Sequence, residues 1–580
     1  MTVLGISAWQ GPIIQFLSLA RLLVCDTVIL CTRGEFYCHC KFRYEIYSTA
    51  TRTGETKLSF CFCNVSIFSI LFYLILIVLQ LEGGRAAQQK HDCCLDPMTP
   101  SERRSKREEY EPTSLEEEST MESEQTLDTL SENLVEDSVQ QQSQEAKRTL
   151  RNFCFMSILF SANHGTIVSC LSLATARLGS VGALQSGILY LFYTLSAVLG
   201  ATYVVKKVGG RNGMIVGMCL YCVYVACFSV ATSFPEIERA AALTGAGFGG
   251  IGAGFLWVAQ GSYFSEAAKR HAAAMAQDVS ESTSYLAGIF AFIYLSFEVL
   301  LRALSSVLAS FLDWRAIFGI YTIIAVLTTI GMLLVIDYGK EDDSSAPTTV
   351  FYKVTAALQL LVKDPKMKYM IGLNATFGFA GAFLNSYVNG QVIAAALDDK
   401  SSRYVGALSS WMALVAALMS LVTAKISMKG PVLIGGALSF FFVAFPFLVQ
   451  PDATMWNIEG LVVIYTLQGI GRATFESTLK ATFADYFASD PAGAFSNIIL
   501  QNGLAGAIGY VLTFRLLCDE PSRYCVEYSD GTLHDVLTFE LLVCVSGIVA
   551  VLGYWRASVL YKKEQEDRVE LIQSEEAEAA

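Results

Sequence analysis

Twelve long apolar stretches between about Asn152 and Ser558 constrain the fold of this chain more than any other feature. About 20 apolar residues are enough for a helix to cross a lipid bilayer. Polar residues interrupt almost every stretch near its middle, and a polar group inside a membrane is costly unless it faces a partner or a wet cavity. The pattern predicts an all-α, polytopic membrane protein with a polar interior, and it disfavours a soluble enzyme.

Composition favours the same class. Of the 580 residues, 53% are hydrophobic and 16% are charged, whereas soluble domains carry about 25% charged residues. The net charge of -12 comes largely from two acidic regions, one from Ser101 to Glu145 and one after Lys562. Neither region has enough apolar surface to offset the entropy lost on ordering, so we expect both to be disordered.

The apolar stretches predict helices in two groups of six. The expected ranges are 152–174, 183–205, 212–233, 241–264, 283–308, 316–336, 369–394, 404–423, 431–449, 457–485, 491–515 and 535–558. A cytoplasmic loop, 337–368, separates an N-terminal half, 149–336, from a C-terminal half, 369–560. Paired halves of this kind are typical of transporter folds.

Outside the two halves we distinguish three segments. Residues 1–100 form an N-terminal extension, 101–148 a disordered acidic linker, and 561–580 an acidic cytoplasmic tail. Within the extension, the uncharged run 59–81 is long enough for one further membrane helix. The alternative is that the first hundred residues are a peripheral extension without a span.

Basic residues predict the topology. Lys and Arg gather in the loops that share a side of the membrane with Lys147 and Arg151, which places both ends of the twelve-helix body in the cytosol. A weak internal repeat is consistent with two halves, because the fourth and tenth expected helices both end with a Tyr-Phe pair, Tyr263-Phe264 and Tyr486-Phe487. The plasma membrane and the endomembranes are both compatible locations.

Two helices carry charged pairs at a spacing of four residues. Arg472 and Glu476 share a face of the tenth helix, and Glu298 and Arg302 share a face of the fifth. Charges within the membrane are candidates for lining a central cavity. The alternatives are a self-satisfied pair near the outer face for Glu298, and for Arg472 a structural intrahelical pair or a helix end with snorkelling side chains.

Neutral polar residues add further cavity candidates. Asn163 and His164 lie near the centre of the first helix, where a histidine either titrates or coordinates a ligand, or packs with a hydrogen bond. Asn374 and Asn385 in the seventh helix and Gln468 in the tenth either line a path or hold helices together.

The fourth helix contains the glycine-rich segment GAGFGGIGAG. Its letters partly match a dinucleotide-binding fingerprint, but no βαβ unit surrounds them. Gly245 with Gly249, and Gly250 with Gly254, instead form small-xxx-small pairs that predict close helix packing.

Two short features lie near the C-terminal end. Cys518 and Cys525 share the last external loop, where a disulfide bond would form in an oxidising compartment. Asp567, followed by Leu571 and Ile572, resembles an acidic dileucine sorting signal.

Catalytic and cofactor motifs are missing from the sequence. There is no GxSxG elbow, HExxH pair or phosphate-binding loop, and the cysteine spacing does not suit a closed metal site. Basic residues follow the loops and form no separate patch for nucleic acid. We therefore expect a protein that is not an enzyme and has no cofactor or metal. The expected partners are the lipid bilayer, a small solute or ion, and another membrane protein such as a channel or receptor.

Five segments resemble the uncoordinated-93-like family, a group of ion-channel regulatory proteins. They correspond to that family's first, fourth, seventh, eighth and tenth helices and read RNFCFMSILFSANHGTIVSCLSLA, LTGAGFGGIGAGFLWVAQGSYF, FGFAGAFLNSYVNGQV, VGALSSWMALVAALMSLVTAKIS and TLQGIGRATFESTLKATFADYF. The resemblance covers about residues 148–560. It implies the fold of the major facilitator superfamily, with twelve helices, two halves and a central cavity.

The resemblance leaves two functions open. Some members of the family regulate potassium channels, some chaperone receptors, and others are regarded as solute transporters. The superfamily's acidic GxxxDRxGR loop reads KKVGGRNG in this chain and lacks the aspartate. We expect either a carrier that moves a small solute or ion by alternating access, or a regulator or trafficking partner that transports nothing.

Overall fold

The computed structural model describes residues 114–339, 358–399, 401–423, 426, 428–488, 490–517, 522, 524–527 and 533–579. These residues belong to one compact unit, Leu71–Ala580. The expected extension 1–100 and its candidate span 59–81 lie outside the described residues.

The N-terminal half is built of helices joined by short turns. Its helices are α3 (Ser114–Leu199), α4 (Ala201–Val208), α5 (Gly210–Ala231), α6 (Glu238–Met275), α7 (Val279–Leu308) and α8 (Trp314–Met332), with a short 3-10 turn η3 (Pro235–Ile237). Helix α3 contains the first two expected helices, separated by a kink at Gly179. Gly179 has φ 54° and ψ -134°, a conformation that residues with a Cβ avoid.

Helix α3 also begins earlier than expected. It starts at Ser114, within the segment 101–148 that composition predicts to be a disordered linker. Glu, Gln, Leu and Lys are good helix formers, so a polar composition does not by itself prevent a helix from continuing outward from the membrane segment. Composition reports how much apolar surface a segment can bury, and it does not report backbone preference.

The C-terminal half repeats the pattern with two interruptions. Its elements are α10 (Pro365–Phe383), η4 (Leu384–Val392), α11 (Ile393–Leu397), α12 (Arg403–Thr423), α13 (Lys429–Val449), η5 (Ala453–Met455), α14 (Ile458–Thr474), η6 (Phe475–Leu479), α15 (Lys480–Tyr486), α16 (Pro491–Arg515), β1 (Cys525–Glu527), β2 (Leu533–Asp535) and α17 (Leu537–Ala579). Segments η4 and η6 are π-helical and lie within the seventh and tenth expected helices. Such segments are rare and frequently occur at functional sites.

Nine helices within the described residues are long and apolar enough to cross a membrane. The first of them, Gln140–Leu199, holds two expected helices on either side of Gly179. The seventh and tenth expected helices are not among the nine, because η4 and η6 divide them into shorter segments. All twelve expected helices are therefore present as helical segments.

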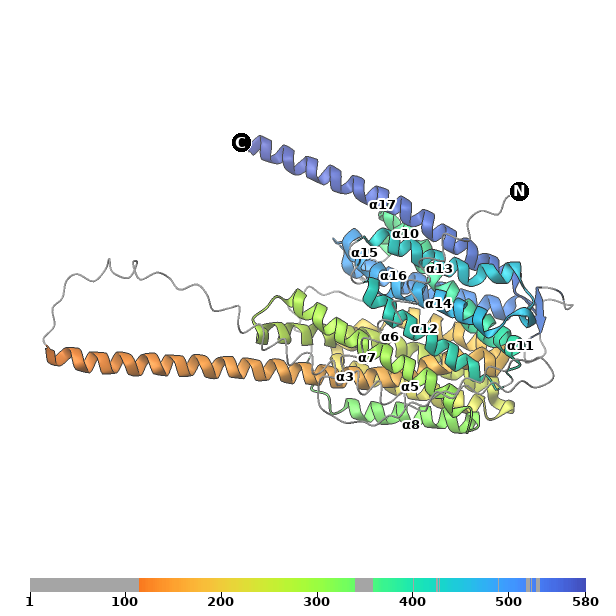
Figure 1. The fold of residues 1–580 in the computed structure, drawn as a ribbon, viewed down its shortest axis with the longest axis horizontal. Coiled ribbons are helices and arrows are strands. Elements are labelled where there is room, and N and C mark those ends of the chain that lie inside the picture. Colours follow the sequence, from red (N-terminus) through yellow and green to blue (C-terminus); the bar gives the residue numbers. More distant parts are fainter. Residues whose placement is uncertain are drawn as a thin grey trace, which may run out of the picture. The chain divides into compact units, whose positions relative to one another are not determined.

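The two halves lie side by side. Helices α3 to α8 (orange to green) occupy one side of the bundle, and α10 to α17 (teal to blue) occupy the other (Figure 1). The halves meet where α7 packs against α12, and where α3 packs against α16 and η4. We call the end of the bundle where α8 ends and α10 begins the inner end, following the charge-based topology, and the opposite end the outer end.

The tyrosines of the internal repeat occupy matching positions. Tyr263 stacks on Tyr338, just beyond α8, with ring centroids 4.8 Å apart. Tyr486 stacks on Tyr561 of α17, with ring centroids 4.2 Å apart. In each half, the tyrosine at the inner end of the fourth helix thus contacts a tyrosine at the end of the sixth.

Small residues bring α6 close to its neighbours. A Cβ added to Gly245 would lie 2.5 Å from the Cβ of Cys227, and one added to Gly249 would lie 2.9 Å from the ring of Tyr224. A Cβ on Gly250 would lie 2.4 Å from the carbonyl oxygen of Leu189. Gly245 and Gly249 therefore face α5, whereas Gly250 and Gly254 face α3.

Apolar side chains cover the outward faces of the helices. Ile323 and Leu327 on α8, Leu418 on α12, and Leu552 and Trp555 on α17 are all exposed. They recur at a spacing of three or four residues, so each helix presents an apolar stripe away from the bundle. A surface of this kind is suited to lipid.

A small antiparallel hairpin lies at the outer end. Strands β1 and β2 pair with Val526 opposite His534. Cys525 of β1 is disulfide-bonded, whereas Cys518 lies outside the described residues. A bond between Cys518 and Cys525 stays a prediction.

Candidate functional site

The most informative contact in the structure joins the two halves through a pair of buried charges. Arg472 of α14 donates from Nη1 to Glu298 Oε1 at 2.5 Å and from Nη2 to Oε2 at 2.7 Å. Glu298 belongs to α7 and is 1% exposed. Two parallel hydrogen bonds between a guanidinium and a carboxylate are stronger and more directional than a single ion pair.

This pair extends into a network of four charged side chains. Arg302 Nη2 lies 2.8 Å from Glu298 Oε1, and Arg472 Nε lies 2.8 Å from Glu476 Oε1. Arg302 Nη1 also approaches the carbonyl oxygen of Ser409 on α12, at 3.5 Å. The two positive and two negative charges balance, as buried charges in a membrane must. The spacing of four residues indicated both intrahelical pairs, but it gave no sign of the pair between α7 and α14.

The π-helical segment η6 positions the last member of the network. Glu476 is the second residue of η6, directly after the end of α14. Its side chain is 30% exposed, whereas those of Arg472 and Glu298 are buried. The network therefore has a closed side at Glu298 and an accessible side at Glu476.

His164 packs in an aromatic group beside this network. Its ring lies 5.4 Å from that of Trp257 and 5.5 Å from that of Tyr294, and its Nδ1 is 3.3 Å from the hydroxyl of Tyr221. Tyr294, which packs on His164, lies one turn before Glu298 on α7. Trp257 and Tyr294 are half-buried and carry no charge, so the sequence gave no reason to single them out.

Asn163, the neighbour of His164, points toward a different helix. Its Nδ2 donates to the carbonyl oxygen of Ala325 at 3.0 Å and to Thr329 Oγ1 at 3.2 Å, both on α8. These bonds join two helices of the same half. The structure therefore separates two adjacent residues that sequence reasoning grouped as cavity candidates.

The remaining polar candidates fall into two groups. Asn374 Nδ2 donates to Gln501 Oε1 at 2.8 Å, which joins α10 to α16 inside the C-terminal half. Asn385 Oδ1 accepts from Asn389 Nδ2 at 3.1 Å within η4. Gln468 is buried one turn from Arg472, and its Oε1 has no hydrogen-bond partner among the described residues.

Contacts between the halves gather between the charged network and the outer end. Three hydrogen bonds to backbone carbonyl oxygens cross between the halves: from Asn389 Nδ2 to Ser172 at 2.9 Å, from Ser410 Oγ to Val299 at 3.0 Å, and from Trp314 Nε1 to Ser401 at 3.1 Å. The rings of Tyr190 and Tyr510 also stack between the halves, with centroids 5.6 Å apart. Tyr465 of α14 also donates to Asn389 Oδ1. The halves are thus held together at the outer end, and Glu476 lies on the inner side of these contacts.

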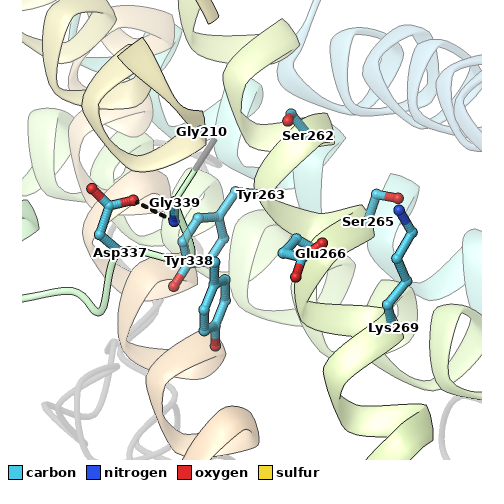
Figure 2. Close-up of a pocket in the computed structure, with 9 residues that line it drawn as sticks. All are labelled: Gly210, Ser262, Tyr263, Ser265, Glu266, Lys269, Asp337, Tyr338 and Gly339. Atoms are coloured by element: carbon cyan, nitrogen blue, oxygen red, sulfur yellow. Dashed lines mark hydrogen bonds between the residues drawn. The ribbon is translucent and has the colours of Figure 1, made fainter. Parts of the chain in front are cut away.

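A pocket opens at the inner end of the N-terminal half. It is lined by Gly210, Ser262, Tyr263, Ser265, Glu266, Lys269, Asp337, Tyr338 and Gly339 (Figure 2). Its volume of about 30 Å³ admits a water molecule but not an organic solute. Arg211 lies 3.4 Å from Asp337 beside this pocket, so the loop that lacks the aspartate of GxxxDRxGR pairs its arginine with the segment after α8.

Metal coordination finds no support in the described ranges. They contain no group of three or more His, Cys, Asp or Glu side chains arranged to hold a metal ion.

Comparison with known proteins identifies the fold. The sequence model of the Major Facilitator Superfamily matches residues 152–510, most of both halves. The chain belongs to the major facilitator superfamily. The prediction of twelve helices in two six-helix halves is thereby confirmed, as is a multi-pass membrane protein. Among curated protein sequences, none matches the chain.

Solved structures of superfamily transporters are similar to this chain in fold. The nucleoside transporter NupG has a TM-score of 0.52 and 12% identity, covering 71% of this chain and 99% of NupG. The xylose transporter XylE from E. coli, in an inward open conformation, has a TM-score of 0.50 and 14% identity, covering 71% of this chain and 96% of XylE. At these identities the likeness extends to the fold alone.

Proposed function

We propose that this superfamily member moves a small solute across the membrane by alternating access, and that the Glu298–Arg472 pair opens and closes with the two halves. The observation that carries the proposal is the bidentate contact between α7 and α14. It is a buried ion pair between the two halves of a membrane protein, and ionisable residues within membrane helices usually mark a substrate or ion path.

The network lets this pair separate at a tolerable cost. Breaking a buried ion pair is strongly unfavourable when it leaves a lone charge. Here Glu298 keeps Arg302 as a partner and Arg472 keeps Glu476, each at 2.8 Å on its own helix. The halves can therefore rock apart at this point without an unpaired charge in the membrane.

A bound solute would shift the equilibrium between the closed and the opened arrangement of the Glu298–Arg472 pair. Opening the bidentate pair frees strong hydrogen-bonding groups between the halves, and a bound solute that satisfies them stabilises the opened arrangement. Occupancy of the site would thus be coupled to movement of the halves, because a ligand shifts a conformational equilibrium only by its differential affinity for the two states.

The test is uptake into liposomes that contain the purified full-length protein, using potassium and a panel of small organic solutes. Flux in the native protein that Glu298→Gln and Arg472→Gln abolish would support the proposal. The matched control is Lys429→Gln with Asp485→Asn, because that pair is exposed at the inner end of the C-terminal half. No flux of any solute in the native protein would contradict it.

A second candidate function is that of a regulator or trafficking partner within the uncoordinated-93-like group. The observation that favours it is the exposure of Leu571 and Ile572 on the last turns of α17, beside Asp567. An exposed acidic dileucine sequence is available to a sorting partner. Relocation of the Leu571→Ala, Ile572→Ala variant in cells, and co-purification of a channel or receptor with the native chain, would support this function. An unchanged location would remove its sorting part.

A further inference from the structure

We propose that the solute is an organic amine with an aromatic body, whose ammonium group binds Glu476 and whose ring packs against Trp257 and Tyr294. This inference rests on the proposed transport function and names the class of compound that the site accepts.

The most exposed side chain of the network, that of Glu476, offers a hydrogen-bond acceptor. Among the described residues, Glu476 has a partner at Oε1 only, and it is the more exposed of the two carboxylates of the network. Gln468 Oε1, earlier in the tenth helix, is a second acceptor without a partner among the described residues, and it is fully buried. Arg472 is engaged through Nε, Nη1 and Nη2. A ligand that binds the free oxygen of Glu476 must donate a hydrogen bond, as an ammonium does.

The net charge of the network also favours a cationic ligand. Glu298, Arg302, Arg472 and Glu476 sum to zero, so an anionic solute would have to displace a carboxylate from Arg472 before it met a positive charge. An ammonium reaches the free oxygen of Glu476 without breaking any contact of the network. Hydrogen bonds between ionised groups are also about twice as strong as those between neutral ones.

Aromatic rings stand beside the charged network on the other half. The rings of Trp257 on α6 and Tyr294 on α7 meet edge to face with centroids 5.6 Å apart, and both are half-buried. Tyr294 precedes Glu298 by one turn of α7, and Glu298 pairs with Arg472, the partner of Glu476.

These two features together define the class of ligand. Tryptophan and tyrosine faces attract cations and stack with planar rings. A carboxylate on one half and an aromatic pair on the other would contact opposite ends of a single arylalkylamine. Binding of such a compound would bridge the halves, as alternating access requires.

The first experiment measures binding to the purified full-length protein in nanodiscs by isothermal titration calorimetry. The probes are tryptamine and phenethylamine, with tryptophol as the neutral counterpart of tryptamine and indole-3-acetate as an anionic one. We expect both amines to bind, tryptophol to bind about tenfold more weakly, and indole-3-acetate not to bind. Absence of amine binding, or equal binding of tryptamine and tryptophol, would overturn the inference.

Variants separate the two ends of the site. Glu476→Gln should weaken tryptamine about tenfold and leave tryptophol unchanged, which also shows that the variant is folded. Its control is Glu459→Gln, since Glu459 is exposed in the first turn of α14 at the outer end. Trp257→Leu should weaken tryptamine and tryptophol alike, by roughly 3- to 30-fold. Its control is Trp555→Leu, on the apolar outward face of α17. A loss of tryptamine binding in Glu459→Gln equal to that in Glu476→Gln would count against the assignment.

Binding and uptake distinguish this inference from the proposed function. Amine binding without uptake in liposomes would support the site and contradict the carrier. Uptake of another solute by protein that binds neither amine would overturn the amine site and leave the carrier standing.

Discussion

Glu298 on α7 and Arg472 on α14 are 174 residues apart in the sequence and meet through two hydrogen bonds of 2.5 and 2.7 Å. Each residue also has a partner one turn along its own helix, Arg302 for Glu298 and Glu476 for Arg472. The contacts within each helix are therefore distinct from the contact that joins the halves. The free energies of unfolding of single and double variants can separate the two kinds of contact.

We expect Glu298→Ala to lower the free energy of unfolding by about 3–5 kcal/mol, because it leaves two buried arginines short of one partner. Glu298→Gln combined with Arg472→Gln should cost less than the sum of the two single changes, since each single change already removes the contact that the two side chains share. Thermal unfolding of the purified protein in detergent provides the measurement.

The exposed pair of Lys429 and Asp485 is the control for this cycle. Its removal should change stability by at most about 1 kcal/mol. Strict additivity of the Glu298 and Arg472 changes would show that the two side chains do not interact.

A cross-link between the halves, near the middle of the membrane segments 183–205 and 491–515, should stop transport. A Cβ on Gly503 of α16 would lie 3.4 Å from the Cβ of Thr194 on α3, close to the separation found in disulfides. We expect the Thr194→Cys, Gly503→Cys variant to form a disulfide under mild oxidation and to lose uptake, with recovery on reduction. Either cysteine alone should leave uptake insensitive to oxidation. Normal uptake by fully cross-linked protein would mean that these helices do not separate.

Neighbouring residues Asn163 and His164 should respond differently to substitution. Asn163→Ala removes bonds to Ala325 and Thr329 on α8 and should destabilise the protein by about 1–3 kcal/mol without changing solute affinity. His164→Phe retains an aromatic ring among Trp257 and Tyr294 and should change solute affinity more than thermal stability. Matched effects of the two variants on affinity would refute this division.

Glycine positions on α6 offer a test of close packing. Gly250→Ala places a Cβ 2.4 Å from a backbone oxygen and should destabilise the protein by about 1–3 kcal/mol. Gly247→Ala meets no atom within 4 Å and should be neutral, or stabilising by up to about 1 kcal/mol through helix propensity. Melting temperatures of the two variants, measured side by side, decide between these outcomes.

Local pattern was sufficient for several features of this protein. Runs of apolar residues located the twelve helical segments, because the length of a membrane helix depends on the thickness of the bilayer and not on its neighbours. The four-residue spacing of Arg472 with Glu476, and of Glu298 with Arg302, placed each pair on one helix face. Both intrahelical ion pairs are present in the structure.

The hydropathy pattern of the sequence did not predict two other local features. The π-helical segments η4 and η6 occur within apolar stretches whose polar residues give no sign of a change in helical pitch. Helix α3 extends outward to Ser114 through residues whose composition predicts disorder. Hydropathy measures preference for lipid over water, so it is insensitive both to a change in helical pitch and to a helix that continues beyond the membrane.

The sequence by itself determined that the chain crosses a membrane many times, where its helices lie, and which charges share a helix face. Only the tertiary structure decided that Glu298 pairs with Arg472, that Asn163 and His164 face different helices, and that Trp257 and Tyr294 stand beside the charged network. The physical reason is that spacing along one helix fixes only the neighbours on that helix. Which face of one helix meets which face of another depends on the rotation and approach of all the helices at once, and small residues such as Gly250 set that approach through contacts far apart in the chain.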